Sequence, residues 1–544
     1  MPPSTKATGS AAASEGIDLA TKQKMLTLNS LLDRAVRLWG DHLAMIDEDR
    51  QLTWKQFQMR VASASGVLAS RGIWRGERFA FVAQNSVRQA ELMHAGFRIG
   101  AIPVPINYRL AAREILAILD DSGSKLLIID RTFAHLLDGT ELATWKERSL
   151  RIDAPADYSA CQYEAAMLTA ALPAPELVQE EDDAILLYTG GTTGRSKGVR
   201  LTHRNLATVA LQNAAKLAPR CDDIYLHVAP MFHSADLLGN AYLACGAAHR
   251  YLAKPTAHLI LETVEKQRIT ATVLPPTILI LVLQDEDLSS FDLSSLRTLV
   301  FGSAPMTKTW IITARDALPS MELWQGYGLT ETSQMLTLDP VPTQSEIAVH
   351  KDDDRVRSAG RALIGTDLVI LDDNGREQPA GVIGEVVARG PQIAKGYLNM
   401  PEETDRQFRH GWFYTGDLGS LDSDGFLYLY DRKKDMVITG GENVYSFEVE
   451  EALVQHPDVM EAAVFGVPDQ VYGESLMAVI IPRSGSSVSA SELIEHCRSL
   501  IGGYKIPRRI VISEELPKNS LGKIVKSQLR QRYANSTGAQ NGQA

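Results

Sequence analysis

Short apolar runs alternate with longer amphipathic stretches in the first part of the chain. Residues 79–83 and 126–129 are apolar runs bounded by polar positions, a pattern typical of buried strands. Each follows a stretch with helical spacing of its apolar residues, 54–70 before the first and 111–118 before the second. This alternation favours an α/β fold in which helices cover parallel sheets.

The pattern changes further along the chain. Residues 366–387 read as short strands separated by glycine turns, which indicates a small β-rich subdomain. Asp424-Gly425 lies between the strand-like segments 417–418 and 426–430, and an Asp-Gly pair in that position predicts a β-hairpin.

A dense run of charged residues, 431–435, marks the expected domain boundary. On composition alone, such a run is an ordinary solvated link. The segment after it has its own apolar pattern, with helices expected at 448–453 and 490–501 and a strand at 476–481. We therefore predict a large N-terminal domain of layered α/β sheets with a β-rich subdomain (27–431), a hinge (432–435) and a small α+β C-terminal domain (436–534).

Both ends of the chain differ from its body. Residues 1–26 are rich in Ala, Ser, Thr and Gly and lack the apolar segment of a secretory signal, and 535–544 are small and polar. We expect both to be disordered tails. Glu15 and Asp18, in a tail without Arg, argue against a mitochondrial transit peptide, and the last three residues are not a peroxisomal signal. The expected location is the cytoplasm.

Composition excludes several classes of protein. The 544 residues are 45% hydrophobic and 22% charged, as in ordinary globular proteins. The net charge of −11 gives no basic face for nucleic acid. The longest apolar stretch, 271–283, is interrupted by Pro275-Pro276, so we expect no membrane span. The 4 cysteines are far apart, which indicates buried free thiols in a reducing compartment.

A loop dense in glycine and threonine follows the strand-like run 183–188, and a helical pattern is expected to start at Leu201. Glycines let backbone N–H groups approach an anion closely, hydroxyls donate hydrogen bonds and lysine adds charge. The loop residues suited to polyphosphate are Thr189, Gly190, Gly191, Thr192, Thr193, Gly194 and Lys197. It is not a Walker loop, because Ser196 and Gly198 stand where that motif needs Gly and Ser or Thr. The alternative is a plain surface turn.

This loop resembles the signature of the adenylate-forming superfamily, which contains acyl-CoA synthetases, firefly-type luciferases and the adenylation domains of peptide synthetases. The family's usual Pro is replaced by Ser196, which we expect to alter loop stiffness more than chemistry. Further family motifs follow in order at 302–305, 325–331, 414–417, 431–432 and 517–524. The resemblance covers nearly the whole chain, 26–533.

The resemblance implies a nucleotide site. Tyr327 would stack on the purine, Thr330 would bond a phosphate oxygen and Glu331 would be a ligand of Mg²⁺. Asp417 would accept the ribose hydroxyls, and Arg432 would approach the ribose and the α-phosphate. The other implied ATP or AMP contacts are Gly302, Ser303, Ala304, Gln325, Gly326, Gly328, Lys434, Asn443 and Lys523.

The reaction implied by the resemblance has two halves. A carboxylate attacks the α-phosphorus of Mg·ATP, giving acyl-adenylate and pyrophosphate, while Lys523 stabilises the negative charge. The small C-terminal domain then rotates about Lys434, which removes Lys523 and admits the thiol of CoA to the acyl carbon. Gly440 and Gly441 match the loop that leaves room for the pantetheine arm.

The sequence predicts the acid pocket less clearly than the nucleotide site. Phe232 and His233 resemble the family segment that borders the carboxylate and gates the thiol path. Asp236 is unexpected in an aliphatic tunnel, so it either faces away or bonds a polar group of the acid. The remaining expected lining is Ala235, Leu237, Gly302, Gly328 and Met335. We expect a small aryl, arylpropenoic or short- to medium-chain aliphatic acid.

The preferred prediction is an ATP-dependent acid:CoA ligase that uses ATP, Mg²⁺ and CoA and acts as a monomer or homodimer on a small-molecule carboxylic acid. Three alternatives stay open: a luciferase-like adenylate oxidase, an enzyme that loads a carrier protein in trans, and a non-catalytic nucleotide-binding module. Product analysis separates the first two from the ligase. The presence of Lys523 argues against the non-catalytic module, because a protein that no longer catalyses the reaction can lose this lysine.

Overall fold

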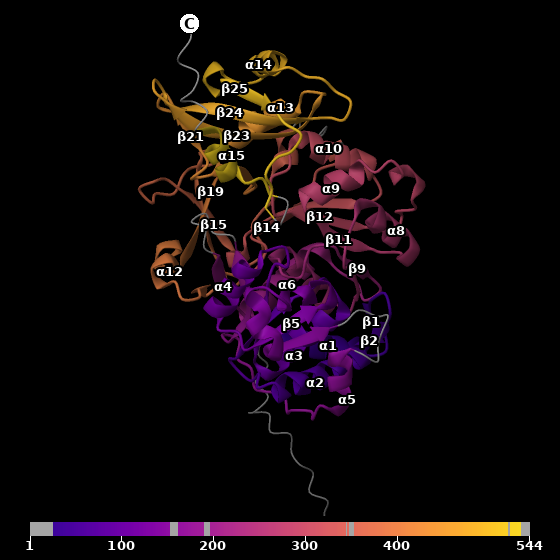
Figure 1. Cartoon of the computed structure of the whole chain (residues 1–544). Helices are drawn as coiled ribbons and strands as arrows, with labels where there is room; N and C mark the ends of the chain where they lie inside the picture. The colour runs from indigo at the N-terminus through magenta and orange to yellow at the C-terminus, as the bar shows by residue number, and fades with distance from the viewer. Residues whose placement is uncertain are drawn as a thin grey trace, which may run out of the picture.

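A computed structural model describes residues 26–152, 161–189, 196–343, 345–346, 353–519 and 523–534. The expected tails therefore lie outside the described residues, except Leu26, as do Gly190, Gly191, Thr192, Thr193 and Gly194. Figure 1 shows a large body and, beyond its orange part, a smaller yellow C-terminal part. Mixed α/β sheets in these two parts confirm the predicted fold class.

The first layer is a parallel four-stranded sheet in the order β4-β3-β5-β6. Its strands are β3 (Arg78–Val82), β4 (Ile102–Pro105), β5 (Leu126–Asp130) and β6 (Ser149–Ile152). The helices of this region are α1 (Leu28–Trp39), α2 (Trp54–Ser70), α3 (Val87–Ile99), α4 (Ala112–Ser122) and α5 (Gln162–Thr169), with 3-10 turns η1 (Arg131–Leu137) and η2 (Glu141–Arg148). The strands and helices expected here are confirmed, α4 running four residues further than its pattern indicated.

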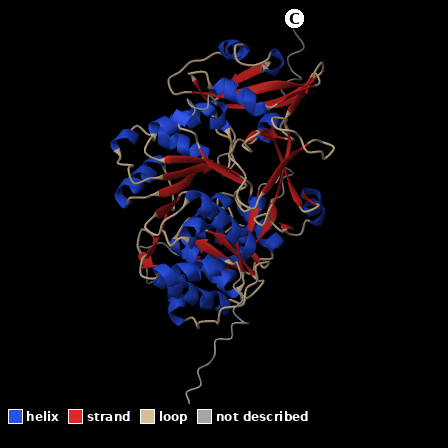
Figure 2. Cartoon of the chain, turned by 180° about the vertical axis from the view of Figure 1, so that it is seen from behind, coloured by secondary structure: helices blue, strands red, loops and turns tan. Residues whose placement is uncertain are grey.

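The second layer is an eight-stranded sheet in the order β14-β13-β12-β11-β9-β10-β1-β2, antiparallel only at its two edges. Its strands are β1 (Leu43–Ile46), β2 (Gln51–Thr53), β9 (Ile224–His227), β10 (Ala248–Tyr251), β11 (Ala271–Leu274), β12 (Thr298–Gly302), β13 (Glu322–Tyr327) and β14 (Thr337–Pro340). Its helices are α6 (His203–Leu217), α7 (Gly239–Ala244), α8 (Ala257–Gln267), α9 (Pro276–Leu283) and α10 (Lys308–Ala317), and Figure 2 shows helices on both sides of these strands.

The segment after the glycine-rich loop corrects one expectation. Residues 201–202 do not begin a helix, because they end strand β8 (Lys197–Thr202), which pairs antiparallel with β7 (Asp183–Thr189). Helix α6 begins at His203, and the Thr202 hydroxyl caps it by accepting the N–H of Asn205 at 3.2 Å. A third strand, β17 (Gly396–Tyr397), lies along β8. The loop thus joins two strands and holds Thr189 opposite Lys197.

The predicted β-rich subdomain is confirmed. It contains β15 (Asp367–Leu371), β16 (Gly384–Arg389), β18 (Phe408–Arg409), β19 (Trp412–Leu421) and β20 (Leu427–Arg432), with α12 (Pro401–Gln407) beside it. The Asp-Gly hairpin joins β19 to β20, and Gly425 adopts the left-handed φ of +81° that such a turn requires.

The C-terminal part is a five-stranded sheet with helices. It contains β21 (Val437–Thr439), β22 (Glu442–Val444), β23 (Val459–Asp469), β24 (Gly473–Pro482), β25 (Arg509–Ile512), α13 (Ser446–Val454), α14 (Ala490–Arg498) and α15 (Lys526–Ala534). Helix α14 ends three residues before the expected 501, where the N–H groups of Leu500 and Ile501 turn back to the Cys497 carbonyl. Each helix in the described part of the chain is too short or too polar to cross a bilayer.

All four cysteines are free. Cys161 and Cys497 are buried as expected, whereas Cys221 and Cys245 are only half-buried. The expectation of buried thiols is therefore confirmed for two of them and wrong for the other two.

Candidate functional site

The candidate site lies at the carboxyl ends of the parallel strands β9, β12 and β13, the edge where ligands bind in open α/β sheets. Gly302 and Gly326 are register partners at the ends of β12 and β13. A Cβ at Gly302 would lie 2.3 Å from the Gly326 carbonyl oxygen, and one at Gly328 would lie 2.2 Å from the Gln334 carbonyl oxygen. These glycines are therefore required by the packing of the protein's own backbone, whatever ligand lies beside them.

The loop after β12 and the strand beside it carry the remaining residues of the expected adenine side. Ser303 has a left-handed φ of +73°, an uncommon conformation for a residue with a side chain, and Ala304 is half-buried next to it. The side-chain oxygen Oε1 of Gln325 is buried and accepts no hydrogen bond from the described residues. It therefore retains the capacity to accept one from a ligand.

Two distant motifs meet at the buried carboxylate of Asp417. The hydroxyl of Tyr327 donates to Asp417 Oδ2 at 2.7 Å, and Arg432 Nε lies 2.6 Å from Asp417 Oδ1. Asp417 and Arg432 face each other across the β19–β20 pair. Burial and the Asp417 charge raise the pKa of Tyr327 well above its usual range, so this hydroxyl stays protonated.

Lys523 reaches the same place from the C-terminal part. Burial and the positive charge of Arg432 lower its pKa to about 8, against the opposing effect of Asp417 and Glu331. Lys523 also acts on His233, whose pKa falls to about 3 through burial and the lysine charge. The structure thus gathers Lys523, Arg432, Asp417, Glu331 and His233 within electrostatic reach of one another, and His233 is neutral at physiological pH.

His233 caps the short 3-10 helix η4 (Ser234–Leu238). Its Nδ1 accepts the N–H of Ala235 at 3.2 Å, which leaves the proton of the neutral ring on Nε2. The hydroxyls of Thr330, at the start of η6 (Thr330–Thr332), and Ser234 lie 3.5 Å apart. Phe232 is buried with its ring edge-on to Tyr108, at 5.2 Å between centroids. Thr330, Phe232 and His233 therefore surround the start of this helix.

Asn85 holds the segment that carries His233, and sequence reasoning missed it. Its amide Nδ2 donates to the carbonyls of His227 and Ala229, at 3.3 and 2.9 Å, and its Oδ1 accepts the N–H of Met231 at 2.9 Å. This buried side chain fixes the path from β9 to η4. A lone Asn after a predicted strand carries no signal for such a role.

Glu331 is the candidate metal ligand. Its Oε1 accepts the hydroxyl of Tyr397 at 2.8 Å, while its Oε2 accepts no hydrogen bond from the described residues. A carboxylate with one oxygen anchored and the other available fits a hard cation such as Mg²⁺. Tyr397 is a second residue that the sequence did not indicate, and it reaches Glu331 because β17 pairs with β8.

Lys197 does not extend into solvent. Its ammonium forms an ion pair with Glu403 of α12 and lies 5.0 Å from the ring centroid of Tyr397. The lysine is therefore held beside Thr189, at the base of the glycine-rich loop.

The expected acid pocket is partly apolar and partly polar. Ala235 and Met335 belong to one buried apolar cluster, and Leu237 is buried as well. Asp236 turns toward the sheet, where its Oδ1 lies 2.6 Å from Nδ1 of His227. This contact gives one oxygen of Asp236 a partner within the protein, and the two orientations that the sequence left open for Asp236 remain predictions.

Three of the expected residues lie apart from this cluster. Gly440 and Gly441, with φ of +60° and +90°, form the turn between β21 and β22, and Asn443 is exposed on β22. No hydrogen bond or ion pair between described residues joins them to Asp417 or Lys523. Lys434 is exposed just after β20, within the expected hinge.

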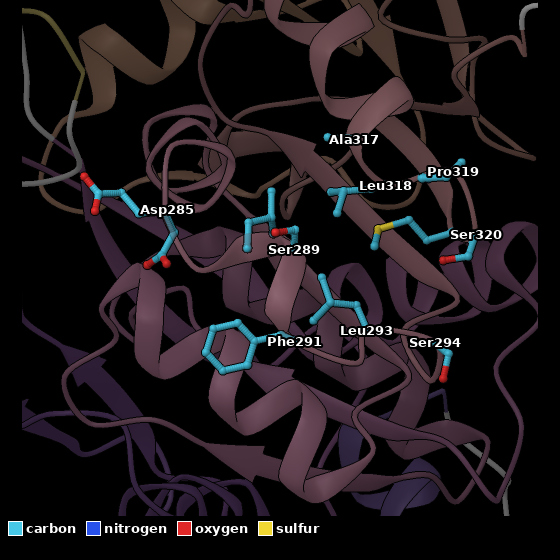
Figure 3. A pocket seen from close by; sticks show the side chains of 12 residues that line it. Asp285, Ser289, Phe291, Leu293, Ser294, Ala317, Leu318, Pro319 and Ser320 are labelled. Carbon is cyan, nitrogen blue, oxygen red and sulfur yellow. The ribbon is translucent and has the colours of Figure 1, made fainter. Parts of the chain in front are cut away.

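A surface hollow of about 520 Å³ is separate from the candidate site. Phe291 and Leu293 line it together with Leu318 and Pro319 (Figure 3). These residues precede β12 and β13, so the hollow lies at the amino ends of the strands whose carboxyl ends carry Gly302 and Tyr327.

Comparison with known proteins gives a consistent result. A family model described as AMP-binding enzyme matches residues 32–398, and one described as AMP-binding enzyme C-terminal domain matches 448–523. Long-chain-fatty-acid–CoA ligase FadD13 of Mycobacterium tuberculosis is 35% identical over 89% of this chain and 94% of its own. Feruloyl-CoA synthase of an Amycolatopsis species is 35% identical with the same coverage. Among solved structures, ATP-bound MatB of Rhodopseudomonas palustris has a TM-score of 0.84 and 29% identity, covering 94% of this chain and 99% of its own.

Proposed function

Because this chain belongs to the AMP-binding enzyme family and is an AMP-forming acyl-CoA synthetase, we propose that it activates a small aryl, arylpropenoic or short- to medium-chain aliphatic acid with Mg·ATP and transfers the acyl group to CoA. The observation that carries this proposal is that Lys523 lies within electrostatic reach of Asp417, Arg432, Glu331 and His233. These residues come from both parts of the chain and from five separate motifs.

In the proposed first half-reaction, the nucleotide lies between the strand ends and Lys523. Asp417, fixed by Tyr327 and Arg432, accepts the ribose hydroxyls, and Tyr327 presents its ring to the purine. The implied nucleotide segment also includes Gly302, Ser303, Ala304, Gln325, Gly326 and Gly328. Thr189, Thr330 and the glycine-rich loop with Lys197 bind phosphate oxygens.

Glu331 would hold Mg²⁺ through the oxygen that Tyr397 leaves available. When bound, the ion would offset the negative charge of the phosphates. Lys523 supplies a second positive charge, directed at the acid's carboxylate and the α-phosphate. Because His233 is neutral, it borders that carboxylate as a hydrogen-bond donor through Nε2 and adds no charge.

The proposed second half-reaction requires the C-terminal part to move. We propose that Lys523, whose charge acts on His233, occupies the place that an incoming thiol would cross, whereas Gly440, Gly441 and Asn443 lie apart from it in this arrangement. Rotation about Lys434 would withdraw Lys523 from the site and bring the segment with Gly440 and Gly441 to it. The hinge for this rotation is 432–435, between domains 27–431 and 436–534. We propose CoA as the thiol, the cytoplasm as the location, and a monomer or homodimer as the working form.

The test measures AMP release by the purified protein with Mg·ATP and CoA across aliphatic, benzoic and cinnamic acids, with the thioester detected by mass. AMP and thioester in equal amounts are the expected result. AMP without thioester would replace the ligase by an adenylate oxidase or a carrier-loading enzyme. ATP binding without turnover of any acid would favour the non-catalytic module.

A further inference from the structure

One face of the eight-stranded sheet changes from small side chains to polar aromatic ones across its width. On β11 and β12 this face carries Ala271, Val273, Val300 and Gly302. On β9 and β10 it carries Tyr225, His227, His249 and Tyr251, which are register partners in pairs. Helix α7 lies directly over this polar part, because a Cβ at Gly239 would be 2.6 Å from Cε1 of His227. This sheet face therefore carries small residues on β11 and β12, beside the candidate acid pocket, and polar residues on the neighbouring strands β9 and β10.

A buried chain of hydrogen bonds orders this polar part. His227 Nδ1 lies 2.6 Å from Asp236 Oδ1, and His227 Nε2 lies 2.9 Å from His249 Nδ1. The His227 ring also stacks on Tyr251, at 4.2 Å between centroids. Burial and the neighbouring histidines His227 and His94 lower the pKa of His249 well below its usual range, so this ring is neutral. The two histidines therefore fix the carboxylate of Asp236 in one orientation.

Three polar atoms at this place lack a partner among the described residues: the Tyr225 hydroxyl, Oδ2 of Asp236 and Nε2 of His249. The hydroxyl of Tyr225 is fully buried and makes no hydrogen bond. Burial and the Asp236 charge raise its pKa well above the usual range, so it stays protonated. Oδ2 of Asp236 accepts no hydrogen bond either, and this side chain retains an exposed fraction of 12%. Buried polar groups are normally satisfied, so an unpaired hydroxyl near a half-paired carboxylate calls for a ligand group.

We propose that Asp236 and Tyr225 bind a hydroxyl group at the end of the acid remote from its carboxylate. This inference rests on the proposed function, since that function places the carboxylate beside His233. A hydroxyl donates one hydrogen bond and accepts another, so it satisfies Asp236 Oδ2 and the Tyr225 hydroxyl together. A ring N–H would satisfy only the carboxylate.

The length of η4 indicates the size of this acid. His233 is the N-cap of η4 and Asp236 is the third residue of this 3-10 helix, which rises about 2 Å per residue, so their backbones are about 6 Å apart along the helix axis. One aromatic ring with a short link spans such a distance. The substrate class is therefore a hydroxyaryl or hydroxyarylpropenoic acid, narrower than the range proposed above.

The test uses pairs of acids that differ only in the distal hydroxyl: 4-hydroxycinnamic against cinnamic acid, and 4-hydroxybenzoic against benzoic acid. Calorimetric titration of the full-length protein measures binding, and thioester formation measures kcat/KM. The hydroxylated acid of at least one pair should bind at least about tenfold more tightly and have a kcat/KM about 100-fold higher, since a site built for a hydroxyl rejects the analogue without it.

Tyr225→Phe removes only the unpaired hydroxyl and should lower the preference about tenfold without affecting the acid that lacks the hydroxyl. Asp236→Ala should abolish the preference. Tyr242→Phe is the matched control, because the Tyr242 ring lies 4.7 Å from the Tyr225 ring between centroids, but its hydroxyl bonds Thr298. This control should keep the full preference.

The outcomes separate this inference from the ligase proposal. Equal binding within both pairs, or binding of none of the four acids, overturns the inference whether or not any other acid forms a thioester. Preferential binding of a hydroxylated acid without thioester supports the recognition of the hydroxyl and contradicts the ligase. A Tyr225→Phe variant that is more stable and keeps the full preference would show that the hydroxyl has no ligand role.

Discussion

Lys523 is a lysine whose ammonium lies among charges of both signs, and its titration should appear in the rate. With a pKa of about 8, it loses its charge within an accessible pH range. If the charged form stabilises the α-phosphate, kcat/KM for ATP in the adenylation half-reaction should fall about tenfold per unit above pH 8, since this parameter reports the free enzyme. Pyrophosphate release measured from pH 6 to 10 checks this expectation.

Two variants of Lys523 serve as controls. Lys523→Arg should keep its charge and remove the alkaline decline, because arginine does not titrate in this range. Lys523→Ala should slow adenylation about 10²- to 10³-fold while thioester formation from supplied acyl-adenylate survives. An equal loss of both half-reactions in Lys523→Ala would contradict the assigned role.

The proposed role of Asp417, binding the ribose of ATP, can be tested on its own. Both of its oxygens are already ordered, by Tyr327 and Arg432, so it receives the ribose without reorganisation. Asp417→Ala should weaken ATP binding about 10- to 100-fold, as measured by calorimetric titration. Asp339→Asn is a matched control, because Asp339 is also a buried carboxylate paired with an arginine, Arg361, but it lies on β14 of the eight-stranded sheet. Unchanged ATP affinity in Asp417→Ala would remove the ribose assignment.

At the scale of elements, the loop from β9 to η4 depends on one side chain. Asn85 makes three hydrogen bonds to the backbone of this loop, and removing them leaves buried polar groups unpaired. Asn85→Ala should cost about 1–3 kcal/mol of stability and also reduce acid activation, because the loop carries His233. Asn29→Ala, which removes one hydrogen bond to the Phe97 carbonyl elsewhere, should lose some stability but keep its activity. Urea unfolding and thioester assays of both variants test this; full activity in Asn85→Ala would contradict it.

The sequence predicts elements well where one local rule acts alone. Helix α2 has both of its expected ends, because Thr53 caps it and the apolar spacing is regular. The pattern fails at Leu201 and Thr202, where strand pairing with β7 overrides a sequence that also suits a helix start. Motif spacing identified Asp417 and Lys523, but Asn85, Tyr397 and His227 act through contacts between segments far apart in sequence, and single residues outside a motif leave no local signal.

At the scale of the whole molecule, the two parts meet through polar contacts and through one shared apolar cluster, in which Trp310 and Ile311 belong to the same core as Val449 and Ala452. Glu451 of α13 accepts the backbone N–H of Lys308 at 3.2 Å and pairs with Arg357 at 2.7 Å. An ion pair with a partly exposed member contributes little to stability, whereas the shared apolar cluster adds to the free energy that a separation requires. The proposed second half-reaction therefore requires the C-terminal part to leave both the polar contacts and this apolar cluster.

The hinge itself gives the sharpest test of that rotation. Lys434 is exposed, and no described residue accepts its backbone N–H, so proline at this position breaks no hydrogen bond of the present arrangement. Proline fixes φ near −65° and removes the freedom that a rotation about this residue needs. Lys434→Pro should therefore keep pyrophosphate release within about twofold and reduce thioester formation by at least about 100-fold.

Lys434→Ala, which removes the same side chain but leaves the backbone free, should form thioester at a rate close to that of the unmodified protein. If both variants form thioester equally well, the pivot lies elsewhere; if both lose adenylation, the Lys434 side chain acts in the first half-reaction instead.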